Sequence, residues 1–269
     1  MPTDLLLVLS GLAAGTFGAL LGLGGGILIV PILTLGFDVP LATAVGTSLI
    51  CVIATSTGAA AVNVRADRAD IRLGITLAAG TVVGALTSAV IAGFLPERVV
   101  AALFALLLGY TAFTMARGLV RPSVRPAGED MMDPSAPDGP GAPAYRTQRL
   151  PAAVGVSFLA GNVSGLLGVG GGIVTVPLLH LLMGAPMRVA VTTSNFMMSI
   201  TAAAGAYAYL FRGDVDPRLA APVVLGVAAG AALGARVSAR MRSSWLIGLF
   251  VVVVVYVAVR MALRALGVS

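Results

Sequence analysis

Charged residues are scarce in this chain of 269 residues: they make up 10% of it, whereas an ordinary soluble domain has about 25%. Apolar residues make up 58%, and the mean hydropathy is +1.00. Such a composition excludes a soluble enzyme and a disordered scaffold. The single cysteine, Cys51, excludes an intrachain disulfide, a disulfide-stapled secreted domain and a multi-cysteine metal site. Few aromatics (6%) and 34 glycines are typical of helices that pack closely in lipid, so we expect a polytopic membrane protein.

Lysine is absent, and all 17 basic residues are arginines, which give a net charge of +6. In a soluble protein this excess would suggest nucleic acid as the partner. Here the arginines lie in the gaps between apolar runs. We therefore interpret them as orientation signals under the positive-inside rule, and we expect no nucleic-acid partner.

Long apolar runs account for most of the chain, and a helix needs about 20 apolar residues to cross the hydrocarbon core. The first and fifth runs exceed 30 residues, and each is interrupted by a glycine cluster. The pattern predicts an all-α polytopic membrane protein with about eight transmembrane helices, in which glycines break the first helix of each half. The runs cover residues 5–36, 41–64, 73–95, 99–116, 152–183, 189–210, 219–237 and 245–263.

The two halves of the chain are copies. With a shift of 146 residues and no gap, the segment 15–31 aligns with 161–177 at ten identical positions of seventeen. The same shift pairs Pro40 with Pro186 and Tyr110 with Tyr256. We therefore expect an internal duplication of a four-helix unit, with repeat 1 over 1–117 and repeat 2 over 151–269.

Residues 118–150 differ from both repeats, since they hold six prolines, four acids and almost no large apolar residue. Such a segment cannot bury enough surface to offset its ordering entropy, so we interpret it as a cytoplasmic linker.

The arginines also predict orientation. With eight crossings and parallel repeats, twelve arginines lie on the side of the termini and the linker and five on the other, so all of these would be cytoplasmic. If the chain instead turns back at each glycine cluster, the repeats are inverted and only the termini move outside, with the same tally. Charge does not decide between the two arrangements.

Two glycine clusters, each followed by a proline, are the strongest pointers to a site: they are Gly24, Gly25 and Gly26, and Gly170, Gly171 and Gly172. Glycine allows positive φ and close approach of the backbone, and a helix that begins within the membrane presents unpaired N–H groups suited to an anion. Matching glycine-interrupted segments in two halves indicate a transporter site. Close helix packing through small residues is the alternative.

Hydroxyl and amide side chains follow both clusters at equivalent positions. They could donate hydrogen bonds to an oxyanion, or they could bond to carbonyls one turn earlier in their own helix. The single histidine, His180, has Thr34 as its counterpart, which favours a hydrogen-bonded structural role. The candidate residues of this second set are Thr47 and Ser48 in repeat 1 and Thr193, Ser194 and Asn195 in repeat 2.

All eleven acids lie in loops or at the ends of runs. This argues against carboxylate proton relays and carboxylate-held cations. We expect no catalytic residue, no metal site, no cofactor and no enzymatic activity.

The segments GLLGLGGGILIVPIL and GLLGVGGGIVTVPLL, each followed by a proline and a Thr-Ser pair, resemble the sulfite exporter TauE/SafE family of membrane permeases. The resemblance covers both halves. It implies a secondary transporter in the bacterial cytoplasmic membrane that moves a small sulfur-containing anion such as sulfite or an organosulfonate. A passive anion channel and a non-transporting scaffold subunit are the alternatives, and the expected partners are the anion and the bilayer, with homo-oligomerisation left open.

Overall fold

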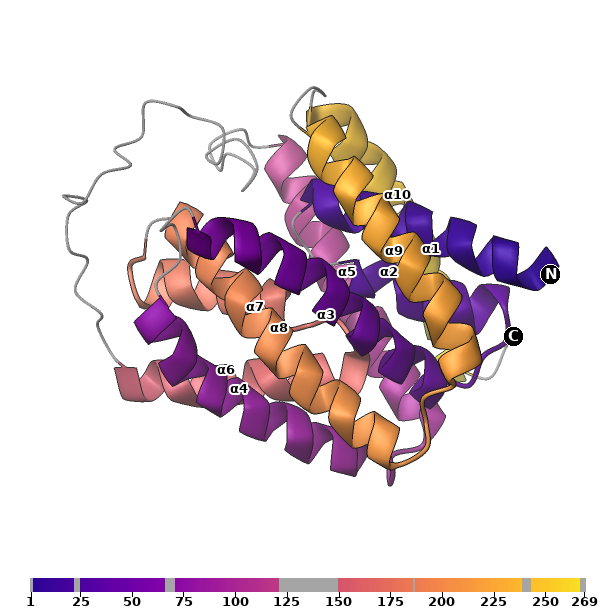
Figure 1. The fold of residues 1–269 in the computed structure, drawn as a ribbon, viewed down its shortest axis with the longest axis horizontal. Helices are drawn as coiled ribbons and strands as arrows, with labels where there is room; N and C mark the ends of the chain where they lie inside the picture. The colour runs from indigo at the N-terminus through magenta and orange to yellow at the C-terminus, as the bar shows by residue number, and fades with distance from the viewer. Residues whose placement is uncertain are drawn as a thin grey trace.

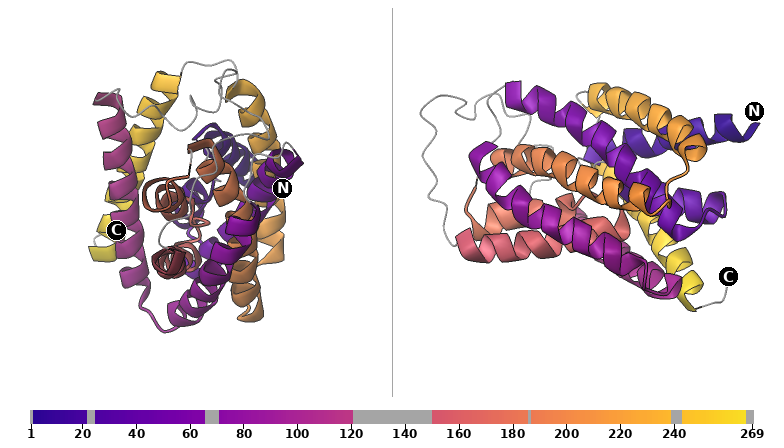
Figure 2. Two further views of the ribbon diagram at one scale, coloured as in Figure 1. Left: turned by 90° about the vertical axis from the view of Figure 1, so that its left-hand side faces the viewer. Right: turned by 60° about the horizontal axis from the view of Figure 1, so that its bottom comes forward.

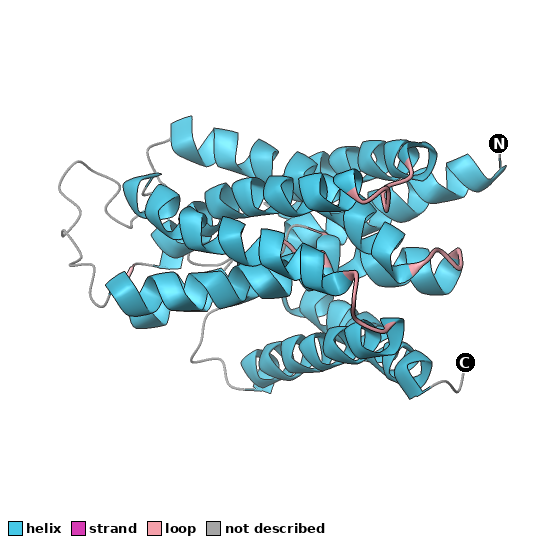
Figure 3. Cartoon of the chain, turned by 90° about the horizontal axis from the view of Figure 1, so that it is seen from below, coloured by secondary structure: helices cyan, strands magenta, loops and turns pink. Residues whose placement is uncertain are grey.

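The computed structural model describes residues 2–21, 25–65, 71–120, 150–185, 187–238 and 243–266. Every regular element in these ranges is a helix, and short loops join them (Figure 3). The predicted all-α class is confirmed. Most of the predicted linker, from 121 to 149, lies outside the described residues.

Ten α-helices and two short π-helices make up these ranges. The first half contains α1 (Pro2–Leu21), α2 (Gly26–Pro31), the π-helix η1 (Ile32–Gly36), α3 (Leu41–Arg65), α4 (Ile71–Ala92) and α5 (Glu97–Val120). The second half contains α6 (Leu150–Leu167), α7 (Gly172–Pro177), the π-helix η2 (Leu178–Leu182), α8 (Met187–Phe211), α9 (Pro217–Ser238) and α10 (Ser243–Leu266).

Several of these helices have the length and composition of membrane spans. Within the described ranges four segments are long and apolar enough to cross a bilayer, and they are Leu41–Ala59, Ile71–Ala92, Glu97–Thr114 and Pro217–Gly234. Large apolar side chains face outward along the bundle; Leu106, Leu225 and Val252 are each about two-thirds exposed or more. An outer surface of this kind suits lipid rather than water.

The helices of the two halves correspond in position and in packing. From α2 to α5, each element has a counterpart whose two bounds lie 146 residues later. The helix α1 packs along α9, and its counterpart α6 packs along α4. The counterparts α3 and α8 pack on each other, as do α5 and α10, which lie side by side in the left view of Figure 2.

Glycines make the close contacts between the halves. A Cβ on Gly15 of α1 would overlap the carbonyl oxygen of Val227 on α9. The counterpart Gly161 on α6 meets the carbonyl oxygen of Thr81 on α4 in the same way. Only a residue without a side chain permits this backbone approach, which is how small residues bring membrane helices together.

The direction of α1 follows from its contacts with α9. Gly11 faces Val223, and Gly15, one turn further along, faces Val227. The two helices therefore run in the same direction, and the start of α1 lies at the same end of the molecule as the start of α9.

The π-helix η1 lies at this same end. Arg264, in the last turn of α10, donates from Nη1 to the carbonyl oxygen of Thr34 in η1 at 2.7 Å and from Nη2 to Glu97, at the start of α5, at 3.1 Å. Arg212, just before α9, donates to the carbonyl oxygen of Ala89, near the end of α4. The loops before α5 and before α9 thus share one end with η1, so α1 and α2 form a hairpin that returns to the end at which α1 starts.

The second half forms a matching hairpin at the opposite end. Leu179 of η2 packs with Leu73 and Leu77 at the start of α4 and with Ala153 at the start of α6. The sequence left open whether the glycine-broken segments turn back; in the structure they do.

The start of α1 and the end of α10 accordingly lie together, as the N and C labels of Figure 1 show, and we call this the terminal end. The helix ends at Val120 and Leu150, which flank the linker, lie at the opposite end, which we call the linker end. This differs from the prediction that the termini and the linker share one side, because that prediction takes each long apolar run as a single crossing.

Candidate functional site

The glycine clusters form the turns that begin the two short helices. Gly25 has a φ of 74° and caps α2, and Gly171 has a φ of 81° and caps α7. The N–H of Leu28 donates to the carbonyl of Gly25 at 3.2 Å, and the N–H of Val174 donates to that of Gly171 at 3.0 Å. The N–H groups before them have no carbonyl four residues back within the short helix, as at any helix start. Gly24 lies outside the described residues.

Ser48 joins the two turns at the centre of the molecule. Its Oγ lies 2.7 Å from the carbonyl oxygen of Gly168 and 3.2 Å from that of Gly26, so one hydroxyl on α3 donates to backbone on both sides. A Cβ on Gly26 would lie 2.6 Å from the Gly168 oxygen. The turns of the two halves are therefore in direct contact, and Ser48 is fully buried between them.

Ser194, the counterpart of Ser48, has a different partner. Its Oγ lies 2.5 Å from Oγ1 of Thr175 on α7, and Thr175 in turn donates to the carbonyl oxygen of Gly171 at 3.2 Å. Both side chains are buried. The hydroxyl of Ser194 thus connects α8 to the turn at Gly171 through Thr175.

The remaining candidate side chains lie one position to either side of these serines. Thr47 and Thr193 are fully buried, and Asn195 is partly buried. The hydroxyl of Thr47 has no hydrogen-bond partner in the described structure. A Cβ on Gly74 of α4 would lie 3.3 Å from the methyl carbon of Thr193, so that methyl group faces α4. The structure therefore brings Ser48, Ser194 and the described cluster glycines together more directly than it does these three residues.

Sequence reasoning missed two polar residues at the turn of repeat 2. Thr175 makes the contacts given above, and Ser164 on α6 lies beside Gly171: a Cβ on Gly171 would be 3.4 Å from Cβ and 3.8 Å from Oγ of Ser164. Ser164 is fully buried, and its hydroxyl has no partner in the described structure. The signal was present, since both residues stand within the repeated glycine motif where repeat 1 has Gly18 and Ile29.

Charged side chains lie away from these turns. The five acids that the structure describes are in the first turn of a helix or in a loop, and they are Asp4, Asp38, Glu97, Asp214 and Asp216. His180 donates from Nδ1 to the carbonyl oxygen of Ala185 at 2.9 Å, which agrees with the structural role expected for it. Among the described residues no group of three His, Cys, Asp or Glu side chains could hold a metal ion. The donors at the turns are thus neutral hydroxyl and N–H groups.

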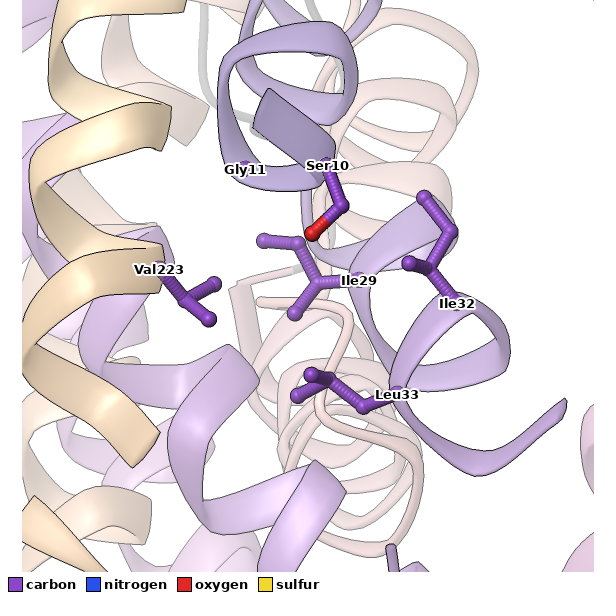
Figure 4. A pocket seen from close by; sticks show the side chains of 6 residues that line it. All are labelled: Ser10, Gly11, Ile29, Ile32, Leu33 and Val223. Atoms are coloured by element: carbon purple, nitrogen blue, oxygen red, sulfur yellow. The ribbon is translucent and has the colours of Figure 1, made fainter. Parts of the chain in front are cut away.

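A small hollow of about 150 Å³ lies apart from the Gly171 turn, where α1, α2, η1 and α9 meet (Figure 4). The hydroxyl of Ser10 donates to the carbonyl oxygen of Leu7 at 2.9 Å and so is already used. The lining is otherwise apolar or glycine, which does not suit an anion. The lining residues are Ser10, Gly11, Ile29, Ile32, Leu33 and Val223.

Comparison with known proteins assigns the chain to a family. The family model described as sulfite exporter TauE/SafE matches residues 7–261. The chain belongs to this family. This TauE/SafE protein is 29% identical over 229 residues to the probable membrane transporter protein YunE of Bacillus subtilis, covering 82% of this chain and 83% of YunE. It is also 29% identical over 211 residues to the probable membrane transporter protein MJ0441 of Methanocaldococcus jannaschii, covering 76% of this chain and 72% of that protein.

No solved structure matches the chain significantly. The family and these relatives, together with the apolar helices, show a multi-pass membrane protein of a transporter family.

Proposed function

We propose that this TauE/SafE protein is a secondary transporter that moves a small sulfur-containing anion, such as sulfite or an organosulfonate, across the bacterial cytoplasmic membrane. The observation that carries the proposal is the meeting of two glycine turns at the centre of the bundle, joined by Ser48 and surrounded by neutral donors. The family description and the transporter names of the relatives support it.

In this proposal the turns and the hydroxyls near them bind the anion. The backbone N–H groups at the starts of α2 and α7 would donate to the oxyanion, and the side chains would complete its coordination. A site without a charged side chain can hold an anion while leaving it free to move on. The proposed site residues are Gly24, Gly25, Gly26, Thr47, Ser48, Gly170, Gly171, Gly172, Thr193, Ser194 and Asn195.

The proposed architecture is an internal duplication of a four-helix unit. Eight long helices, α1, α3, α4 and α5 with their counterparts, would lie in the bilayer, and α2 and α7 would return halfway through it as parts of the hairpins. The common shift of 146 residues in the helix bounds supports this arrangement. Repeat 1 over 1–117 and repeat 2 over 151–269 would be joined by the linker 118–150.

The linker end is proposed to face the cytoplasm. Five arginines lie in helix turns at this end, and seven more stand in the segments that connect helices there, against five arginines at the terminal end. The positive-inside rule then places the linker in the cytoplasm and both termini outside. The twelve at the linker end are Arg65, Arg68, Arg72, Arg117, Arg121, Arg125, Arg146, Arg149, Arg188, Arg236, Arg240 and Arg242.

A passive anion channel is the second candidate, because no described acid lies in the middle of a helix where a coupling proton would bind. Reconstitution of the purified chain alone into proteoliposomes tests both. A transporter gives saturable sulfite flux that is accelerated by sulfite or a sulfonate on the opposite side or by an imposed ion gradient. A channel gives fast flux that does not saturate and drives a current, and a scaffold subunit gives no flux above that of empty vesicles.

A further inference from the structure

Three buried hydroxyl groups from three different helices gather at the turn of repeat 2. Ser164 comes from α6, Thr175 from α7 and Ser194 from α8. Thr175 bonds to the Gly171 carbonyl and to Ser194, and Ser164 lies beside the point where a side chain on Gly171 would begin. The absence of a side chain at Gly171 leaves these groups next to bare backbone.

The turn of repeat 1 lacks this cluster. The residues 146 positions earlier are Gly18, Ile29 and Ser48, so two of the three hydroxyls are missing. The one that is present, on Ser48, donates its single proton to the carbonyls of Gly26 and Gly168. In a duplicated protein the two turns therefore differ in the chemistry they offer a ligand.

The protons at the Gly171 turn can be assigned one by one. Thr175 donates its only proton to the carbonyl of Gly171, so Ser194 must donate to Thr175. The hydroxyl of Ser164 is fully buried and has no partner in the described structure. A buried hydroxyl without a partner costs free energy, and a ligand that accepts its hydrogen bond removes that cost.

We propose that the transported anion binds at the Gly171 turn alone, one anion to each chain, with Ser164 as the side-chain donor that recognises it. This rests on the proposed function and narrows it, since the turns are not equivalent sites. Thr175 and Ser194 would hold the Gly171 carbonyl away from the anion by keeping it hydrogen-bonded, and an oxyanion with several acceptor oxygens would take the proton of Ser164 together with backbone N–H groups.

The test is the binding of sulfite, and of methanesulfonate as an organosulfonate probe, to the full chain in detergent by isothermal titration calorimetry. Ser164→Gly is the main variant, because repeat 1 has glycine at the equivalent position and the fold accepts it there. Ser157→Ala is the matched control: Ser157 lies two turns earlier on α6 and is also buried with an unpartnered hydroxyl. Thr47→Ala removes the unpartnered hydroxyl of repeat 1.

We expect one anion to bind per chain and Ser164→Gly to weaken it by about tenfold to a hundredfold, the value of one hydrogen bond to a charged group. Ser157→Ala should bind as the unaltered chain does, and all variants should show similar melting temperatures. Unchanged affinity in Ser164→Gly, an equal loss in Ser157→Ala, a loss in Thr47→Ala instead, or two anions per chain would overturn the inference while leaving the transporter proposal intact. If the unaltered chain binds neither probe, both proposals fail.

Discussion

Single hydroxyl groups hold the centre of this molecule together. Ser48 on α3 donates to carbonyl oxygens in the turns of both halves, and Ser194 on α8 reaches the second turn through Thr175. The two serines are counterparts in the sequence, yet one bridges the halves and the other stays within its own. Equivalent positions in a duplicated chain can thus acquire separate tasks.

Ser48→Ala should lower the free energy of unfolding by about 1–3 kcal/mol, because two buried carbonyl oxygens lose their donor. Thermal unfolding of the purified protein in detergent measures this. The control is Thr76→Ala, which removes an exposed hydroxyl that bonds only to its own helix and should change stability by less than about 0.5 kcal/mol. Equal stability in both variants would mean that Ser48 does not join the turns.

Gly171→Leu should abolish sulfite binding, as should Gly25→Leu. Leucine rarely adopts the positive φ of these turns, and its side chain would occupy the space beside the backbone. Gly184→Leu carries the same backbone strain, at a φ of 69°, but has nothing within 4 Å, so it should still bind. Each variant must first be monodisperse in detergent; folded Gly171→Leu with normal affinity would remove the turn from the site.

Helices and their lengths followed well from the sequence, and the direction of the chain did not. The run 73–95 became α4, Ile71–Ala92, and the run 219–237 became α9, Pro217–Ser238, because lipid imposes both apolarity and length on a crossing helix. The reversal between α1 and α2 stayed open, since the arginine tally is the same for both arrangements. Contacts between α1 and α9, distant in sequence, decide it.

The site was predictable only in its repeated part. The glycines stand out because they recur in both halves, whereas Ser164 and Thr175 occur in one half and carry no such signal. Periodicity gives no warning that a hydroxyl will be left without a partner, since this depends on which neighbouring helix packs over it.

Gly161→Ala should destabilise the pair α4 and α6 by about 1–3 kcal/mol, because the new methyl group would press on the Thr81 carbonyl. Gly155→Ala on the same helix meets nothing within 4 Å and should be neutral or slightly stabilising. Denaturant unfolding in detergent compares the two. If both variants are equally stable, close glycine contact is not what holds these helices together.

Across the whole molecule, the two hairpins point in opposite directions, and so the ends of the chain and the linker lie at opposite ends of the bundle (Figure 1). An odd number of full crossings in each half produces this arrangement, with α3, α4 and α5 in the first and their counterparts in the second. The orientation in the membrane is then one choice for the entire bundle.

Asp216→Cys, at the terminal end, should react with a membrane-impermeant maleimide added to intact cells, and Ser135→Cys, in the linker, should react only after the cells are opened. The native Cys51 is fully buried and should contribute little background. The opposite labelling pattern would place the linker outside. Labelling of both sites in intact cells would contradict a single orientation.

The pairing of α1 with α9 also has a consequence for the order of assembly during synthesis. Gly15 must wait for Val227, some 212 residues later in the chain, and at about 5–20 residues per second this is a delay of roughly 10–40 s. Throughout that time the glycine face of α1 has no native partner, while α6 finds α4 already made. The first hairpin is therefore the last to be completed, and the early part of the chain depends on the surrounding lipid or on an insertion factor until translation has nearly ended.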